Sequence, residues 1–224
     1  MRPIGGYFEL ELSKGNQEYH QTHALKSGRA ALHFILKHVK AKKIYIPFYT
    51  CDALLEPIKV VEIPFEFYSI TEAFEPKHLP TLSKNEYFLY VNYFDLKRDI
   101  VEILSRKYGA QLIVDCSQAF FLKANGRSWY FNSCRKFFGV PDGSYVYAPD
   151  SLQVEVNFER NKNFTVQHLI KRKLQEVEEG YSYYLQNEEL CGPELKQMSQ
   201  LSEDLLSHVD YEICIKKRNK NFQI

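Results

Sequence analysis

Apolar side chains recur along the first part of the chain in a helical rhythm. In the segment SGRAALHFILKHVK, residues 27–40, they fall three or four positions apart, for example at Ala31, Ile35 and Val39. This spacing is typical of an amphipathic helix. Ser27 precedes the first apolar position, where a helix N-cap is expected. The pattern predicts a helix that begins just after Ser27.

Short apolar and aromatic runs between the helical segments predict β-strands. The runs are KKIYIP (42–47), VEIPFEFYSI (61–70), YFLYVNYF (87–94), AQLIVD (110–115), SWYFN (128–132) and GSYVYAP (143–149). Two more helices are expected, at CDALLEPI (51–58), where Pro57 should break the helix, and at DIVEILSRKYG (99–109), where Gly109 should end it. Strands and helices that alternate with short links predict an α/β fold, a three-layer α/β/α domain with a mainly parallel sheet.

The pattern changes near residue 160. The segments TVQHLIKRKLQEVEEGYSYYLQNEELC (165–191) and MSQLSEDLLSHVDYEICIKKRNKNF (198–222) are polar and helical, and neither contains a strand pattern. We therefore divide the chain into a large domain, residues 1–160, and a helical tail, residues 161–224.

Composition narrows the classes of function. The 29 basic and 28 acidic side chains nearly cancel, so no charge excess indicates nucleic acid or a membrane surface as a partner. We find no apolar segment typical of a signal peptide or a membrane span. The five cysteines are scattered without a CxxC pair, which favours a reduced, cytoplasmic chain. His20 and His23 are three residues apart but have no evident third ligand, so we expect no metal site.

Asp115 closes the apolar run LIVD, and Gln118 follows it after two residues. A parallel strand that ends in Asp places a carboxylate at the carboxyl edge of the sheet, where open α/β sheets bind ligands. The alternative is that Asp115 caps a following helix. Position alone leaves both interpretations open.

Lys136 follows one strand later, in the aromatic segment that contains Phe131, Phe137 and Phe138. A lysine with aromatic neighbours usually extends its ammonium group to water. Desolvation would instead lower its pKa and make it a nucleophilic amine. One cofactor needs both a lysine and a carboxylate. Pyridoxal 5′-phosphate forms a Schiff base with the lysine, while the carboxylate faces its pyridine nitrogen.

The phosphate of such a cofactor needs free backbone amides, which a helix N-terminus offers. The segment SGRAAL, residues 27–32, provides such a terminus. The sequence thus predicts a pyridoxal phosphate site built from this turn, Asp115 and Lys136.

Several segments, in order, resemble the sugar aminotransferases of the DegT/DnrJ/EryC1/StrS family, which depend on pyridoxal phosphate. SGRAALHFIL is similar to the family's Ser-Gly-Thr-Ala-Ala-Leu segment at the phosphate-binding helix, and LIVDCSQAF to its Asp-x-Ala-Gln signature, with Ser117 in place of Ala. Further similar segments are KKIYIPFYTCDALLEPI, YFLYVNYFDL, RKFFGVPDGSYVY and DYEICIKKRNKNF.

This resemblance implies a role for each matched residue. Lys136 would hold the cofactor covalently, Asp115 would pair with the pyridine nitrogen, and Gln118 would contact the phenolic oxygen. The phosphate would be held by Ser27, Gly28 and Arg29. The alternative for Arg29 is an exposed cation on the helix surface.

The chain departs from the family pattern at four positions, at two of which Arg29 replaces a Thr and Asp95 replaces a frequent Gly. Cys51 stands where the family has an aromatic side chain stacked on the cofactor ring, and Tyr49 is the candidate replacement. Phe131 stands where the family has a phosphate-binding serine, so that Ser133 would substitute only if the loop is rearranged.

Family members continue into a smaller C-terminal domain and build their sites across a homodimer. The resemblance therefore implies that the tail leads towards a small domain that this chain lacks. It also implies a homodimer, with the Tyr-rich part of the tail as the candidate contact. The alternative is that this tail packs on its own sheet.

The first functional hypothesis is an aminotransferase that moves an amino group from glutamate or glutamine to a nucleotide-linked keto sugar, in polysaccharide biosynthesis. A sugar-deoxygenating relative is the second, but such relatives carry His in place of the lysine, and Lys136 disfavours it. The third is a truncated, inactive large domain with a structural or vestigial role.

Overall fold

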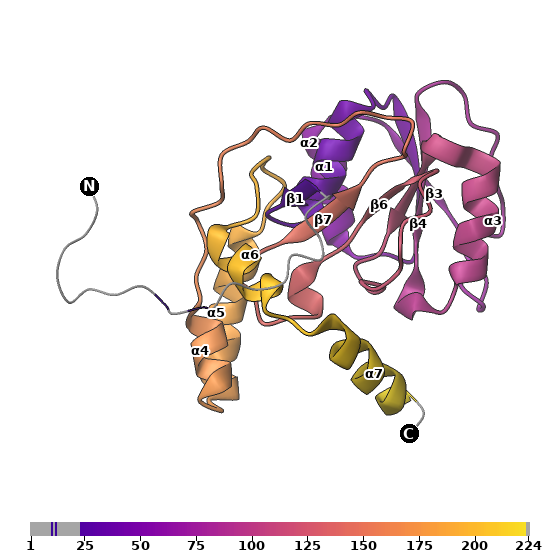
Figure 1. Ribbon diagram of the computed structural model, residues 1–224. Helices are drawn as coiled ribbons and strands as arrows, with labels where there is room; N and C mark the ends of the chain where they lie inside the picture. Colours follow the sequence, from indigo (N-terminus) through magenta and orange to yellow (C-terminus); the bar gives the residue numbers. More distant parts are fainter. Residues whose placement is uncertain (1–9, 11, 13–22, 223–224) are drawn as a thin grey trace.

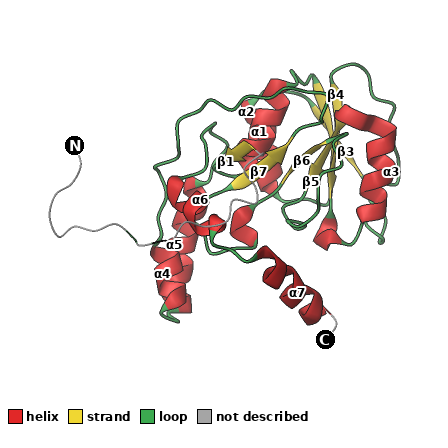
Figure 2. Ribbon diagram, viewed as in Figure 1, coloured by secondary structure: helices red, strands yellow, loops and turns green. Residues whose placement is uncertain are grey.

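The computed structural model describes residues 10, 12 and 23–222, and its strands form one seven-stranded sheet (Figures 1 and 2). The strand order is β1-β7-β6-β5-β4-β2-β3. The strands are β1 (His23–Leu25), β2 (Lys43–Pro47), β3 (Phe65–Tyr68), β4 (Glu86–Val91), β5 (Leu112–Asp115), β6 (Trp129–Phe131) and β7 (Ser144–Tyr147). The five neighbouring strands β6, β5, β4, β2 and β3 pair in parallel. At the other edge, β7 pairs with β6 and β1 pairs with β7, both in antiparallel fashion. The predicted α/β class with a mainly parallel sheet is confirmed.

Helices cover both faces of this sheet, as Figure 1 shows. Helices α1 (Gly28–His38) and α2 (Leu55–Val60) pack over one apolar cluster, and α3 (Arg98–Tyr108) packs over a second cluster on the opposite face. The central strand β4 alternates between the two clusters. Its Leu89 belongs to the α1 side, and its neighbour Phe88 belongs to the α3 side. This period of two, with both faces buried, explains why the strand is apolar throughout.

Local signals set the ends of two helices as predicted. The Ser27 hydroxyl accepts a hydrogen bond from the Ala30 amide at 3.0 Å and so caps α1. Gly109 ends α3 with φ at +52°, a conformation that a side chain would disfavour. The predicted break at Pro57 is wrong, because α2 runs through this residue. Pro57 lies in the first turn of α2, where no backbone N–H is needed for the helix ladder.

Beyond β7 the described tail contains helices and isolated bridges, as its sequence predicted. The helices are α4 (Gln167–Lys173), α5 (Val177–Leu190), α6 (Gln200–Ser207) and α7 (Tyr211–Phe222). Figure 1 shows α4 and α5 side by side below β1, with α7 as a separate arm. The division of the chain at residue 160 stays a prediction.

A buried carboxylate ties this tail to the sheet domain. Asp142, which is fully buried just before β7, accepts hydrogen bonds from the Asn161 amide at 2.8 Å and from the Ser199 hydroxyl at 2.6 Å. It also accepts from the Ser199 backbone amide and the Ser202 hydroxyl. Because its partners come from two parts of the tail, Asp142 fixes the start of the tail and α6 to the same point of the sheet.

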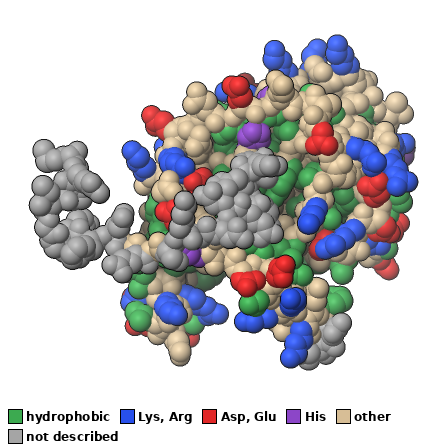
Figure 3. Space-filling model, viewed as in Figure 1, with side chains coloured by type: hydrophobic (Ala, Val, Ile, Leu, Met, Phe, Trp, Pro, Cys, Tyr) green, Lys and Arg blue, Asp and Glu red, His purple; other side chains and the backbone are tan. Residues whose placement is uncertain are grey.

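The surface bears charges of both signs. Figure 3 shows Lys and Arg side chains interspersed with Asp and Glu side chains over the visible face, in keeping with the near balance of charge along the chain. Within residues 23–222, no helix is both long enough and apolar enough to cross a membrane.

Candidate active site

Two adjoining cavities, of about 290 and 250 Å³, lie at the carboxyl ends of the parallel strands. The residues that line both are Cys51, Asp115, Ser117 and Lys136. The larger also reaches the start of α1, and we call it the helix-start cavity; the smaller, beside Tyr49 and Gln118, we call the strand-end cavity. This edge of the sheet is where open α/β folds bind their ligands.

All nine residues predicted for the site line at least one of these cavities. They are Ser27, Gly28, Arg29, Tyr49, Cys51, Asp115, Gln118, Ser133 and Lys136. They come from four separate segments of the chain, so their meeting is a result of the sheet topology. The role of each residue stays a prediction.

Asp115 is the last residue of β5, between Val91 of β4 and Phe131 of β6. Its carboxylate is buried and accepts a hydrogen bond from the Ser117 amide at 2.7 Å. Burial raises the pKa of Asp115, while the bond to Ser117 and the nearby charge of Lys136 oppose that rise. The residues after Asp115 form turns, so this carboxylate caps a turn and not a helix.

Lys136 ends a short 3₁₀ turn, Cys134–Lys136, that follows β6. Its side chain is exposed, and its ammonium group has no hydrogen bond or ion pair with residues 23–222. In the described structure the Lys136 side chain therefore extends to water, and is not desolvated among its aromatic neighbours. Its described influence is electrostatic, since its positive charge opposes the rise of the Asp115 pKa that burial causes. The amine is therefore free to react with a ligand in either cavity.

Aromatic rings form one wall of the strand-end cavity. Tyr49 stacks on Tyr93 with ring centres 5.7 Å apart, and the Tyr93 hydroxyl donates to the Tyr49 carbonyl at 2.7 Å. The Gln118 side-chain oxygen accepts from the Phe94 amide at 3.2 Å. Phe94 itself has φ at +56°, an uncommon conformation for this residue type. Sequence reasoning missed Tyr93, although it lies two residues beyond the end of β4.

The start of α1 lies close to the end of β6. A Cβ atom on Gly28 would approach the Asn132 carbonyl to 3.4 Å, at the limit of ordinary contact, so glycine suits this close approach. Phe131 is buried at the family's serine position and lines the same cavity as Ser133. Ser133, the predicted substitute, and Phe131, which stands at the family's serine position, thus line the same cavity.

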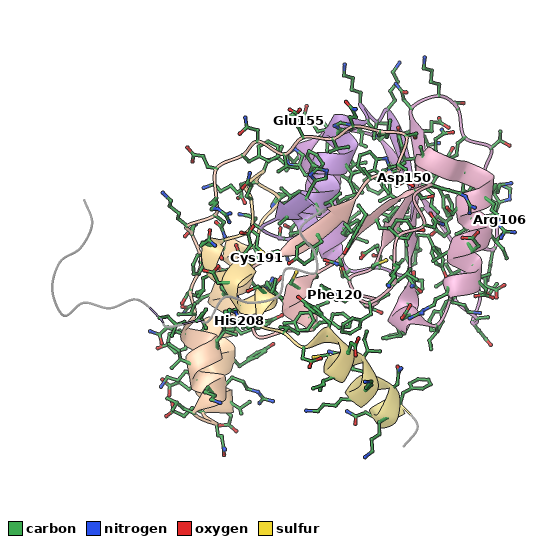
Figure 4. All side chains as sticks on the ribbon, in the orientation of Figure 1. Arg106, Phe120, Asp150, Glu155, Cys191 and His208 are labelled. Atoms are coloured by element: carbon green, nitrogen blue, oxygen red, sulfur yellow. The ribbon has the colours of Figure 1, made fainter. Side chains whose placement is uncertain are left out.

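The Ser27 hydroxyl is already engaged both as a donor and as an acceptor. Besides capping α1, it donates a hydrogen bond to the Gly192 carbonyl at 3.0 Å. Cys191, next to this carbonyl and labelled in Figure 4, ends α5 beside the sheet. The tail thus covers the predicted phosphate-binding turn.

Arg29 is not the exposed surface cation of the alternative interpretation, because only 16% of its side chain is exposed. Its guanidinium lies 3.1 Å from the Glu56 carboxylate and 3.0 Å from the Glu188 carboxylate. It also donates to the Cys191 carbonyl at 2.9 Å. Residues of the tail therefore satisfy most of the donors that a phosphate would use.

Arg135 is a cation that sequence reasoning missed. Its side chain is 10% exposed, forms an ion pair with Glu188, and lies over the Tyr184 ring at 5.7 Å. Burial opposes ionisation of Glu188, but its bonds to Arg135 and Arg29 lower its pKa overall. The sequence showed only that a second basic residue, Arg135, precedes Lys136. The partner of Arg135, Glu188, lies more than fifty positions away along the chain.

The cysteines and histidines offer no second site among the described residues. All five cysteines are free, and burial raises the pKa of the Cys116 and Cys134 thiols, which makes them poor nucleophiles. Residues 23–222 contain no group of three metal-ligating side chains. His20, one of the two histidines considered above, lies outside the described residues.

Comparison with known proteins gave structural matches alone. No protein-family model matches the chain, and no curated protein sequence matches it. Solved structures with a similar fold include the sugar aminotransferase CalS13 from Micromonospora echinospora, with 15% identity, a TM-score of 0.45, and coverage of 58% of this chain and 42% of that one. A DegT DnrJ EryC1 StrS aminotransferase from Brucella abortus matches with 14% identity, a TM-score of 0.42 and the same coverage.

AtS13 from Actinomadura melliaura matches with 17% identity and a TM-score of 0.47, over 65% of this chain and 49% of that one. The chain therefore spans less than half of the length of these solved structures. The first two are aminotransferases, the kind of protein that the sequence resembles. The function proposed below rests on the residues of the site.

Proposed function

We propose that the chain is a pyridoxal phosphate-dependent aminotransferase that transfers an amino group from glutamate or glutamine to a nucleotide-linked keto sugar. The observation that carries this proposal is that Asp115 and Lys136 line the same two cavities. They lie at the carboxyl edge of a parallel sheet, with the first turn of a capped helix beside them.

The residues present fit this cofactor. Asp115 offers a buried carboxylate for the pyridine nitrogen, and Lys136 offers an amine without a described partner. Gln118 lines the strand-end cavity with them, and Arg29 and Arg135 supply positive charge in the helix-start cavity. When bound, pyridoxal phosphate withdraws electrons from the carbon that carries the amino group.

Each of these side chains has a physical task in the proposal. The Asp115 carboxylate would hold a proton on the pyridine nitrogen, and burial strengthens this interaction because little water screens it. Lys136 would bind the cofactor covalently through its amine and would carry the proton that moves during amino transfer. The stacked pair of Tyr49 and Tyr93 would shield one side of the cavity from water.

Optical spectroscopy of the chain mixed with pyridoxal phosphate tests the proposal. We expect a visible absorption band that Lys136→Ala abolishes, because the band requires a covalent bond to the lysine amine. Lys84→Ala is the matched control, since Lys84 is exposed and lies outside both cavities. Borohydride reduction followed by peptide mass spectrometry should place the cofactor on Lys136. The same spectrum for wild type and Lys136→Ala would overturn the proposal and leave the inactive-domain alternative.

The finer parts of the proposal come from the family resemblance. They are a role in polysaccharide biosynthesis, a cytoplasmic location and assembly as a homodimer. Sedimentation at several protein concentrations tests the assembly. Mass spectrometry of nucleotide-linked keto sugars incubated with the chain and glutamate tests the reaction, with an aminated product as the expected result.

A further inference from the structure

Two arginines enclose one carboxylate in the helix-start cavity. Arg29, in the first turn of α1, and Arg135, just before Lys136, both pair with Glu188 near the end of α5. All three residues line the cavity. Glu188 thus brings a negative charge from the tail into the place where the site residues converge.

The surroundings are those of an anion-binding site. Two guanidinium groups that point at one carboxylate can also hold a phosphate, because both ligands offer oxygen atoms to the same fork of N–H donors. The Arg135 side chain is nine-tenths buried, and its Nε atom has no hydrogen-bond partner among the described residues. The arginine therefore retains one unused donor that an anion with more oxygen atoms could satisfy.

We propose that Glu188 occupies an anion-binding seat formed by Arg29 and Arg135, and that a phosphate group binds there by displacing the Glu188 carboxylate. That this phosphate belongs to pyridoxal phosphate rests on the proposed function. The seat itself does not, because any phosphate of similar size would bind to the same two arginines.

The exchange needs only a rotation of the Glu188 side chain. The backbone around it is held independently, since Arg29 donates to the Cys191 carbonyl at 2.9 Å and Ser27 donates to the Gly192 carbonyl at 3.0 Å. These bonds do not involve the Glu188 carboxylate. The end of α5 can therefore stay in place while the carboxylate leaves.

The competition has a measurable consequence. In the wild-type chain a phosphate must replace an existing ion pair, so part of its binding free energy is offset by the loss of the Glu188 contacts. Glu188→Gln keeps the shape of the side chain but removes its charge. Arg135 is then buried without a full counter-charge, which disfavours the free state and favours the phosphate-bound state.

Calorimetric titration with inorganic phosphate tests this proposal, with sodium chloride used to keep the ionic strength constant. We expect Glu188→Gln to lower the dissociation constant for phosphate about tenfold, as the loss of one strong competing ion pair implies. Glu189→Gln is the matched control, because Glu189 is adjacent and exposed and does not line the cavity. Its dissociation constant should equal that of the wild type.

Arg135→Gln should lose phosphate binding in the wild-type background, which tests whether this arginine belongs to the seat. If Glu188→Gln does not fold, Glu188→Asp replaces it. The shorter carboxylate cannot reach both arginines equally and should give a smaller gain in affinity of the same sign. An unchanged or weaker affinity in the folded variant overturns the proposal, as does an equal gain in Glu189→Gln.

The outcome is separate from that of the proposed function. A gain in phosphate affinity without a Lys136-dependent visible band would keep the anion seat and remove the aminotransferase. A Lys136-dependent band without that gain would keep the cofactor and overturn the role of Glu188.

Discussion

The strand-end cavity and the helix-start cavity share four residues but differ in how their polar groups are satisfied. Around the first, Lys136 has no described partner, and Gln118 makes one hydrogen bond through its side chain. Around the second, Ser27, Arg29 and Arg135 are all engaged by groups of the tail. One cavity offers groups that are ready for a ligand, whereas the other offers groups that a ligand must compete for.

This difference shows that a site can be assembled without being equally open at both ends. The strand ends are fixed by the sheet, and Asp115 at the end of β5 lines both cavities. The start of α1 meets the carbonyl-rich end of α5, so the chain satisfies these donors itself. Ligand affinity at that end then depends on the tail as much as on the sheet.

The largest expected effect comes from breaking the link between tail and sheet. Asp142→Ala removes the buried carboxylate that accepts from Ser199, Ser202 and Asn161. Several buried donors then lack a partner, so the free energy of unfolding should fall by about 3 kcal/mol or more. Urea denaturation measures this loss. Asp150→Ala, at an exposed position, is the control and should change little. A loss as small as that of the control would show that the tail is held by other contacts.

The next effect concerns a single group at the start of α1. Ser27→Ala removes both the helix cap and the donor to Gly192, so the free energy of unfolding should fall by about 1 to 2 kcal/mol. Ser133→Ala provides the contrast. The Ser133 hydroxyl lines the same cavity but makes no hydrogen bond with the described residues. Equal losses in the two variants would contradict the difference in engagement between these hydroxyl groups.

The third prediction uses the burial of Asp115. Burial raises its folded pKa above the ordinary value of 3.8, so the folded state binds this proton more tightly than the unfolded state does. The ionised carboxylate therefore costs stability, and this cost grows as the pH rises from 3.8 through the raised pKa. It is absent at pH values below the ordinary one.

Asp115→Asn should remove this cost. Relative to the wild type, the variant should gain stability as the pH rises through that window, and urea denaturation across the window measures the change. Asp99→Asn, at an exposed position in α3, should show no comparable trend. A relative loss of stability with rising pH would mean that the partners of Asp115 outweigh its burial.

The smallest expected effect concerns the aromatic wall. Tyr49→Leu removes the ring that stacks on Tyr93, and because Tyr49 is more than half exposed the loss should be only about 0.5 to 1 kcal/mol. Tyr49→Phe keeps the stacked ring and should match the wild type in a denaturation experiment. A similar loss in both variants would assign the effect to the hydroxyl group.

Local signals carried most of the fold. The apolar spacing after Ser27 located α1, and short apolar runs located every strand except β1, because each depends on residues within a few positions of one another. The error at Pro57 came from treating proline as a breaker without knowing where the helix begins. An N-terminal turn tolerates proline, and sequence periodicity does not fix that turn to within one residue.

The sequence by itself determined which groups stand at the strand ends. Asp115 and Lys136 could be assigned to one edge of the sheet because each follows a recognisable strand, and parallel strands bring their carboxyl ends together. The tertiary structure alone decided which groups of the tail meet the helix-start cavity. The pairing of Arg135 and Arg29 with Glu188 joins residues that are 53 and 159 positions apart. Such a contact leaves no local periodicity in the chain, because it depends on where α5 packs and not on the residues beside it.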